Sequence, residues 1–116
     1  MSELSWTVLT TVPTHRVEFH VLHRVTQHEF PAMLPFEVVY EKRHGKRHPV
    51  KRKYSLFPRY VFVGLRNIAD DFDRLRRAIP EIQGIVSRSR GAWSPLVLSP
   101  DDVAFIARLV DGCASM

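Results

Sequence analysis

Hydrophobic and polar residues follow strand-type and helix-type patterns in alternation along this chain. Short runs rich in β-branched or aromatic residues predict strands at residues 6–11, 34–40, 54–65, 83–87 and 96–98. Apolar residues three and four positions apart predict amphipathic helices at residues 15–28, 69–79 and 100–111. Strands joined by a hairpin in the middle and by helices outside predict an α+β fold. We expect an antiparallel sheet of about four strands with packed helices, related to the split βαβ arrangement, in a single domain over residues 1–116.

Capping and helix-breaking residues mark the ends of the predicted helices. Thr14 is predicted to cap the first helix, and Pro80 to end the second. Ser99 before Pro100, with acidic residues in the first turn, predicts the start of the third helix, which Gly112 ends.

The strand at 54–65 is apolar on both faces. Tyr60 and Phe62 fall on one face, and Val61 and Val63 on the other. Such a strand is covered on both sides, either by a helix layer on each face or by one helix layer and a protein partner. In the strand at 34–40, the better apolar face falls on the even-numbered residues, which end at Tyr40.

Composition narrows the class of protein. A hydrophobic content of 45% is typical of a globular chain and above the disordered range. Cys113 is the single cysteine, which excludes an intramolecular disulfide and fits a reducing cytosol. No apolar run approaches the roughly 20 residues that span a bilayer, and the N-terminus lacks a signal-peptide pattern. We therefore expect a cytoplasmic monomer that does not bind membranes.

Positive charge is concentrated in residues 41–53, predicted to form a basic loop or hairpin arm. This segment carries a net +6, which leaves −1 for the rest of a chain whose total is +5. Its basic residues are Lys42, Arg43, Lys46, Arg47, Lys51, Arg52 and Lys53. Such a segment on a neutral body indicates a polyanion-binding site; the alternative is a solvated hairpin tip. Because no aromatic residue lies between these cations, backbone contact is favoured over base stacking.

Four segments resemble, in order, the N-terminal (NGN) domain of NusG-type transcription factors. The run Leu56–Val63 (LFPRYVFV) resembles the Phe-Pro-Gly/Asn/Arg-Tyr signature followed by alternating aliphatics. Trp6 with the aliphatics after it resembles the opening strand, residues 77–84 the Arg-Ser-x-Pro-x-Val-x-Gly stretch, and residues 95–99 the closing segment. The resemblance covers roughly residues 6–109.

The resemblance implies a regulator that promotes processive elongation or antitermination. Its partner would be the clamp helices of the RNA polymerase largest subunit, gripped by Phe57, Tyr60, Phe62 and Trp6. Core packing is the alternative role for these aromatics. The basic arm would contact upstream duplex or non-template DNA. Arg76 and Arg77 would form a second polymerase contact, or supply favourable charge at a helix C-terminus.

The chain also departs from the family pattern. Many members have glycine where Arg59 stands, and the glutamate early in the first helix aligns with Glu18 only after a two-residue shift. We expect Glu18 to be buried beside a basic partner. The residues after Arg108 are too few for the small β-barrel, the KOW domain, that usually follows, so we expect the NGN domain alone.

Catalytic and cofactor motifs are missing from the sequence. It has no G-x-S-x-G, no P-loop, and no cysteine or clustered carboxylates that complete a metal set with His44 and His48. We expect a non-enzymatic protein without cofactor or metal. One alternative is a free-standing RNA- or DNA-binding module on an RRM-like sheet. Another is a small nuclease, which would need a metal-binding carboxylate pair.

Overall fold

The computed structural model describes residues 3–42, 44–45, 47–91 and 93–114. Its strands are β1 (Ser5–Thr11), β2 (Ala32–Met33), β3 (Phe36–Glu41), β4 (Val50–Ser55), β5 (Tyr60–Leu65) and β6 (Ile82–Ile85). Its helices are α1 (Val17–Gln27), α2 (Ile68–Ala78) and α3 (Pro100–Ala114). Among the described helices, none has the length and apolar character that a membrane crossing requires.

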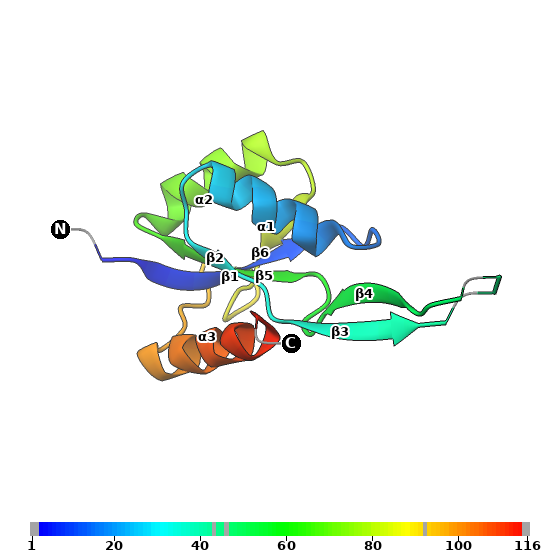
Figure 1. Ribbon diagram of the computed structural model, residues 1–116. Helices are drawn as coiled ribbons and strands as arrows, with labels where there is room; N and C mark the ends of the chain where they lie inside the picture. Colours follow the sequence, from blue (N-terminus) through cyan, green and yellow to red (C-terminus); the bar gives the residue numbers. More distant parts are fainter. Residues whose placement is uncertain (1–2, 43, 46, 92, 115–116) are drawn as a thin grey trace.

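Strands β2, β5, β1 and β6 form a four-stranded sheet in that order, with every pair antiparallel. Helices α1 and α2 lie on one face of this sheet, and α3 crosses the other (Figure 1). Strands β3 and β4 form a separate two-stranded ribbon that projects to one side of the main sheet, and β3 contacts α3. The predicted α+β fold with a four-stranded antiparallel sheet is confirmed.

The two faces of β5 belong to two different hydrophobic clusters. Val61 and Val63 lie with Leu9 in the cluster beneath α1 and α2, and all three are fully buried. Phe62 lies with Ile106 of α3 in the second cluster, on the opposite face. Burying each such side chain stabilises the fold by about 1.5–3 kcal/mol. Of the two covers predicted for this strand, the structure has the helix layer on each face.

The single strand predicted at 54–65 is two strands in two sheets. Pro58 has no backbone N–H to donate to a ladder, and Arg59 adopts φ 71°, in the left-handed region. The chain therefore turns between Ser55, where β4 ends, and Tyr60, where β5 begins. This turn joins the main sheet because the backbone N–H of Thr11 donates to the carbonyl of Arg59 at 2.9 Å.

Two of the three helices, α2 and α3, begin after a residue whose side chain caps the first turn. Asn67 caps α2 by accepting from the Asp70 N–H, and Ser99 Oγ accepts from the Asp102 N–H at 3.1 Å. The predicted cap at Thr14 is wrong, because α1 begins after Arg16, which has φ 60° and provides no side-chain cap. The Thr14 carbonyl instead accepts from the Val17 N–H within a tight turn.

The last predicted strand, at 96–98, is an extended segment without strand assignment. Its backbone is nevertheless tied to the sheet: Leu96 N–H donates to the Val86 carbonyl at 2.9 Å, and Leu98 N–H donates to the Trp6 carbonyl at 2.8 Å. These two bonds fix the direction in which the chain enters α3 and so place that helix across the sheet face.

Candidate functional site

The four aromatic residues singled out by the sequence lie on the α3 face of the sheet or at its margin. In the β1–β5 register Trp6 pairs with Gly64 and Thr10 with Tyr60, and paired residues project to the same side as Phe62. Phe57 joins them from the β4–β5 turn and packs with Phe62 against α3. The fold therefore brings together residues that lie as far apart in sequence as Trp6 and Phe62.

Exposure divides these four aromatics into two kinds. Tyr60 is 41% exposed at the margin of the face, while Phe62 is 6% exposed beneath α3. Phe57 and Trp6 are half-buried at the edges of the same cluster. A partner that docks on this face therefore meets the Tyr60 ring directly, with Phe62 as buried support.

More apolar surface extends along both sides of α3. Leu56, in the β4–β5 turn, is 41% exposed. At the other side a groove of about 410 Å³ runs between β1 and α3. It is lined by Leu4, Ser5, Trp6, Val97, Leu98, Pro100, Val103, Ala104 and Ala107. We call Tyr60, Phe57, Leu56 and the Trp6 end of this groove the aromatic surface.

The basic segment occupies the end of β3, the connection and most of β4. Strand pairing sets Tyr40 opposite Lys51 and Val38 opposite Lys53, so these four side chains share one face of the ribbon, which we call the lysine face. At its base, the Lys53 ammonium lies 4.9 Å from the centre of the Phe36 ring. This cation–π contact holds Lys53 without neutralising it.

Tyr40 is a candidate that the sequence reasoning missed. The alternating pattern placed it on the buried, even-numbered face, and this is wrong, because its side chain is 66% exposed. Leu34, at the start of the same pattern, is buried as expected. The difference arises because the chain leaves the main sheet after β2, so that β3 pairs only with β4, and Tyr40 lies near the far end of this ribbon. An aromatic residue directly before the basic segment was the signal available in the sequence.

The opposite face of the ribbon is internally neutralised. Arg52 Nε lies 3.2 Å from Glu41 Oε2, and the Tyr54 hydroxyl donates a hydrogen bond to the same carboxylate. That hydrogen bond, then desolvation, then the charge of Glu41 raise the pKa of Tyr54 above the usual 10.0. Arg52 is therefore less available to a phosphate than Lys51 and Lys53 are.

The remaining predicted cations lie at the surface or outside the described residues. Lys42 and Arg47 are exposed near the tip, and Arg43 and Lys46 fall outside the described part. Arg76 and Arg77 are exposed in the last turn of α2. The Arg77 guanidinium lies 3.1 Å from Asp73, an intrahelical pair of the kind that contributes only a few tenths of a kcal/mol.

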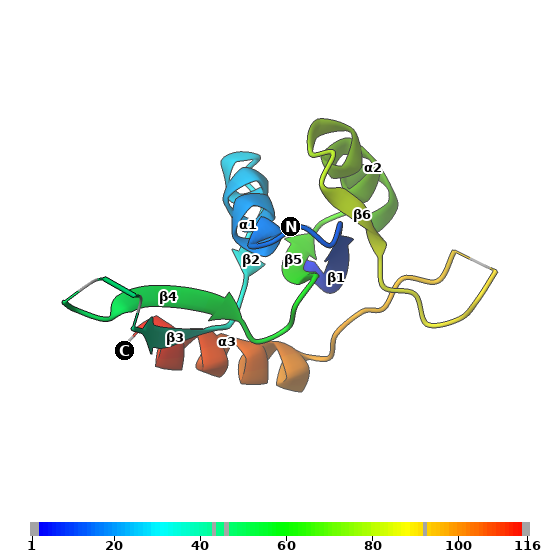
Figure 2. The same ribbon diagram turned by 90° about the vertical axis from the view of Figure 1, so that its right-hand side faces the viewer.

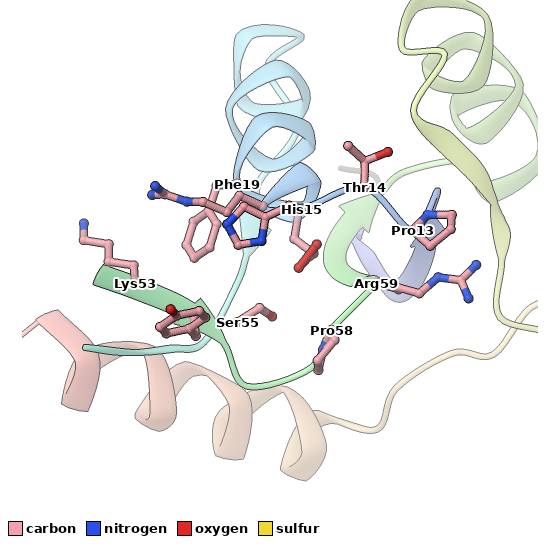
Figure 3. Close-up of a pocket in the computed structure, with 11 residues that line it drawn as sticks. Pro13, Thr14, His15, Phe19, Lys53, Ser55, Pro58 and Arg59 are labelled. Carbon is pink, nitrogen blue, oxygen red and sulfur yellow. The ribbon is translucent and has the colours of Figure 1, made fainter. Parts of the chain in front are cut away.

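A small pocket lies between the first turn of α1 and the β4–β5 turn (Figure 3). It has a volume of about 290 Å³, and Glu18, 8% exposed, is among its lining residues. Arg16, Lys53 and Arg59 line the same pocket. The expected burial of Glu18 is confirmed, whereas its expected basic partner stays a prediction. Among the described residues Glu18 forms no ion pair with these cations. Arg59 instead donates to the Thr11 carbonyl at 3.2 Å and to Gln83 Oε1 at 2.6 Å.

Clustered metal-ligand side chains are not found among the described residues: no three histidine, cysteine, aspartate or glutamate side chains there could hold one ion. The acidic start of α2 has a structural role instead. Asp71 Oδ2 accepts from the backbone N–H groups of Arg66 and Asn67, at 3.1 and 3.0 Å.

Comparison with known proteins agrees with the motif and the fold. A search of curated proteins found no match. The family model described as "Transcription termination factor nusG" matches residues 4–107, which is most of the chain and includes every strand of the sheet. This chain belongs to the NusG family of transcription factors.

Proposed function

We propose that this protein binds the clamp helices of RNA polymerase through its aromatic surface and nearby DNA through its lysine face, and so promotes processive elongation or antitermination. Membership of the NusG family makes RNA polymerase its partner in general and transcription its process. The observation that carries the finer assignment is Tyr60, which is 41% exposed at the margin of an aromatic cluster whose central ring, Phe62, is buried. The protein acts without catalysis, as a cytoplasmic monomer.

The aromatic surface suits a pair of amphipathic helices. Exposed aromatics over a packed base supply much of the energy in such interfaces. The position of Tyr60 is set in advance, because its backbone N–H donates to the Phe57 carbonyl at 3.1 Å and its neighbour Val61 is fully buried. Little conformational entropy is therefore lost when a partner covers the Tyr60 ring.

DNA contact through the ribbon is compatible with polymerase contact through the aromatic surface. The ribbon contacts α3 through β3 and projects to one side of the main sheet (Figure 1). Lys51 and Lys53 share one face of the ribbon, and no acidic residue in the described part of the chain forms an ion pair with them, which suits sequence-independent contact with phosphates. The candidate ligands are the upstream duplex and the non-template strand. Bridging in this way would hold the clamp closed around DNA and disfavour pausing.

The two other functions considered from the sequence have less support. An RRM-like module binds nucleic acid on an open sheet face, whereas here helices cover both faces and Phe62 is buried under α3. A nuclease on this sandwich would need a free carboxylate pair, yet Asp71 is engaged by two backbone N–H groups at the start of α2.

A single-round transcription assay with purified polymerase on a pausing template tests the proposal. The wild-type protein should shorten pauses without any added factor, and Tyr60→Ala should not, although its fold is intact. A termination factor is added in a parallel reaction. Factor-dependent termination stimulated by this protein, with no effect on pausing, would overturn the elongation assignment while leaving family membership in place.

A further inference from the structure

The connection between β6 and α3 contains a firmly tied turn. Ser87 forms a β-bridge with Pro95, and the Arg88 N–H donates to the Ser94 carbonyl at 2.7 Å. The Ser87 hydroxyl lies within hydrogen-bond distance of two carbonyls, that of Ser89 at 2.8 Å and that of Ser94 at 3.1 Å. These contacts join residues 87–88 to residues 94–95, and we call the segment between them the Trp93 turn. Its position is on the opposite side of the molecule from the β3–β4 ribbon (Figure 2).

One face of the Trp93 ring stacks on Phe72, and the rest of the side chain is accessible to solvent. Its ring centre lies 5.8 Å from that of Phe72, with 26° between the planes, so the two rings stack. Phe72 is 7% exposed in the core beneath α2 and cannot move without disturbing that core. Trp93 itself is 58% exposed. The core thus fixes the orientation of a large aromatic surface that the fold leaves accessible to solvent.

The chemistry around this ring is cationic. A shallow hollow beside it is lined by Ser87, Arg88, Ser89, Arg90, Gly91 and Trp93, with no carboxylate among them. Arg88 is steadied by donating to the Val97 carbonyl at 3.4 Å, and Arg90 is exposed. On α2, Arg76 comes one helical turn after Phe72 and is also exposed. A flat apolar ring bordered by arginines and small polar residues fits a planar, negatively charged ligand.

We infer that the Trp93 turn binds an unpaired nucleotide of a single nucleic-acid strand, with the base stacked on Trp93 and the adjoining phosphates on Arg88 and Arg90. Single-strand binding proteins combine these two elements, aromatic platforms for bases and cations for the backbone. The inference does not depend on polymerase binding. It also differs from the contact proposed for the ribbon, because the ribbon would bind phosphates without stacking on bases. The two surfaces lie on opposite sides of a molecule 51 Å long, so their contributions are separable.

Fluorescence titration of the isolated protein with oligonucleotides tests the inference directly. The probes are oligothymidylate and oligouridylate of about ten nucleotides, and a DNA strand of equal length whose sugars carry no bases. Stacking on Trp93 should quench tryptophan emission with the first two and not with the abasic strand. The abasic strand should also bind at least about fivefold more weakly, the effect expected when one base no longer stacks. A preference for thymidylate or uridylate identifies DNA or RNA as the natural strand.

Substitutions then assign the signal to the turn. Trp93→Ala should weaken oligothymidylate binding at least about fivefold. Trp93→Phe retains Trp6, so loss of quenching in that variant assigns the signal to Trp93. Arg90→Ala should lower the log–log salt slope by about 0.7 for each phosphate that the protein no longer neutralises. Arg108→Ala, which removes an exposed cation from α3, is the control of equal charge and should leave the quenching unchanged.

Equal quenching by the abasic strand, or wild-type affinity in both folded Trp93→Ala and folded Arg90→Ala, would overturn the inference. Loss of polymerase binding in Trp93→Ala without any oligonucleotide binding by the wild type would also overturn it, and would make the turn a protein contact. Circular dichroism checks the fold of each variant. The comparison of normal with abasic strands needs no variant and stands even if one of them fails to fold.

Discussion

The ring of Phe57 packs edge-on against the ring of Phe62, with centres 5.4 Å apart and planes at 86°. This contact joins the β4–β5 turn to the central strand of the sheet. Phe62 is covered by α3 while Phe57 reaches the edge of the cluster, and Tyr60, two residues before Phe62 on β5, is 41% exposed. The arrangement separates an aromatic side chain that a partner can touch from one that is buried in the core.

That separation predicts different effects for neighbouring substitutions. Tyr60→Ala should weaken binding to core polymerase by at least about 2 kcal/mol, roughly 30-fold, as expected for an interface hot spot. Its free energy of unfolding should fall by less than that of Phe62→Ala, because Tyr60 is 41% exposed whereas Phe62 is 6% exposed. Affinity capture with purified polymerase and chemical denaturation measure the two quantities. A folded Tyr60→Ala that binds normally would refute the interface.

Phe62→Ala is the matched control for the core. It removes a ring that is 6% exposed and should lower the free energy of unfolding by about 3–5 kcal/mol. If Tyr60→Ala were equally destabilising, Tyr60 would be a core residue and core packing would be its role.

Removing one positive charge from each face of the ribbon should affect DNA binding to different extents. Lys51→Gln removes a charge that no described acidic residue pairs with, and should lower the log–log salt slope by about 0.9 for each phosphate that Lys51 neutralises in the wild type. Arg52→Gln removes a charge already paired with Glu41 at 3.2 Å, and should change the slope less. Salt titrations of duplex binding by elongation complexes compare the two. Identical slopes for both variants and the wild type would mean that the ribbon is a solvated tip.

The hydrogen bond between Tyr54 and Glu41 predicts a pH dependence at the alkaline end. The folded state raises the pKa of Tyr54 above 10.0, so the stabilisation is fully present below pH 10 and is lost as the pH rises through the higher folded value. Tyrosinate absorbance should therefore show one tyrosine that ionises late. In Glu41→Ala this step should move toward 10.0. An unchanged titration in that variant would show that Glu41 is not the cause.

The backbone conformation of Arg59 predicts that its glycine variant is more stable than its alanine variant. Arg59 has φ 71°, where a side chain costs roughly 1–2 kcal/mol and glycine does not, which is the physical reason why glycine suits this motif position. Its guanidinium offsets that strain through its bonds to Thr11 and Gln83. Arg59→Ala loses the bonds and keeps the strain, so it should be less stable than Arg59→Gly by about 1 kcal/mol. Thermal denaturation measures the order, and equal stability would mean that the backbone is unstrained there.

Several features of this protein follow from the sequence by itself. The alternation around Phe62 and the helical spacing of α2 and α3 predict the right elements, because both depend on side-chain periodicity within a few residues. Ser99 predicts the start of α3 for the same reason, since a cap bonds within its own turn. The concentration of positive charge and the Phe-Pro-Arg-Tyr motif are likewise local, and they were enough to indicate the family.

Tertiary structure decided which of these residues a partner can touch. The exposure of Tyr60, the burial of Phe62 and the stacking of Trp93 on Phe72 all depend on α3 and α2 being packed against strands distant in the sequence. The exposure of Tyr40 depends on β3 pairing only with β4, outside the main sheet, although its local pattern is that of a buried strand. Burial is a property of the whole packed chain, since it is set by long-range contacts whose combined free energy, rather than any local preference, selects the fold.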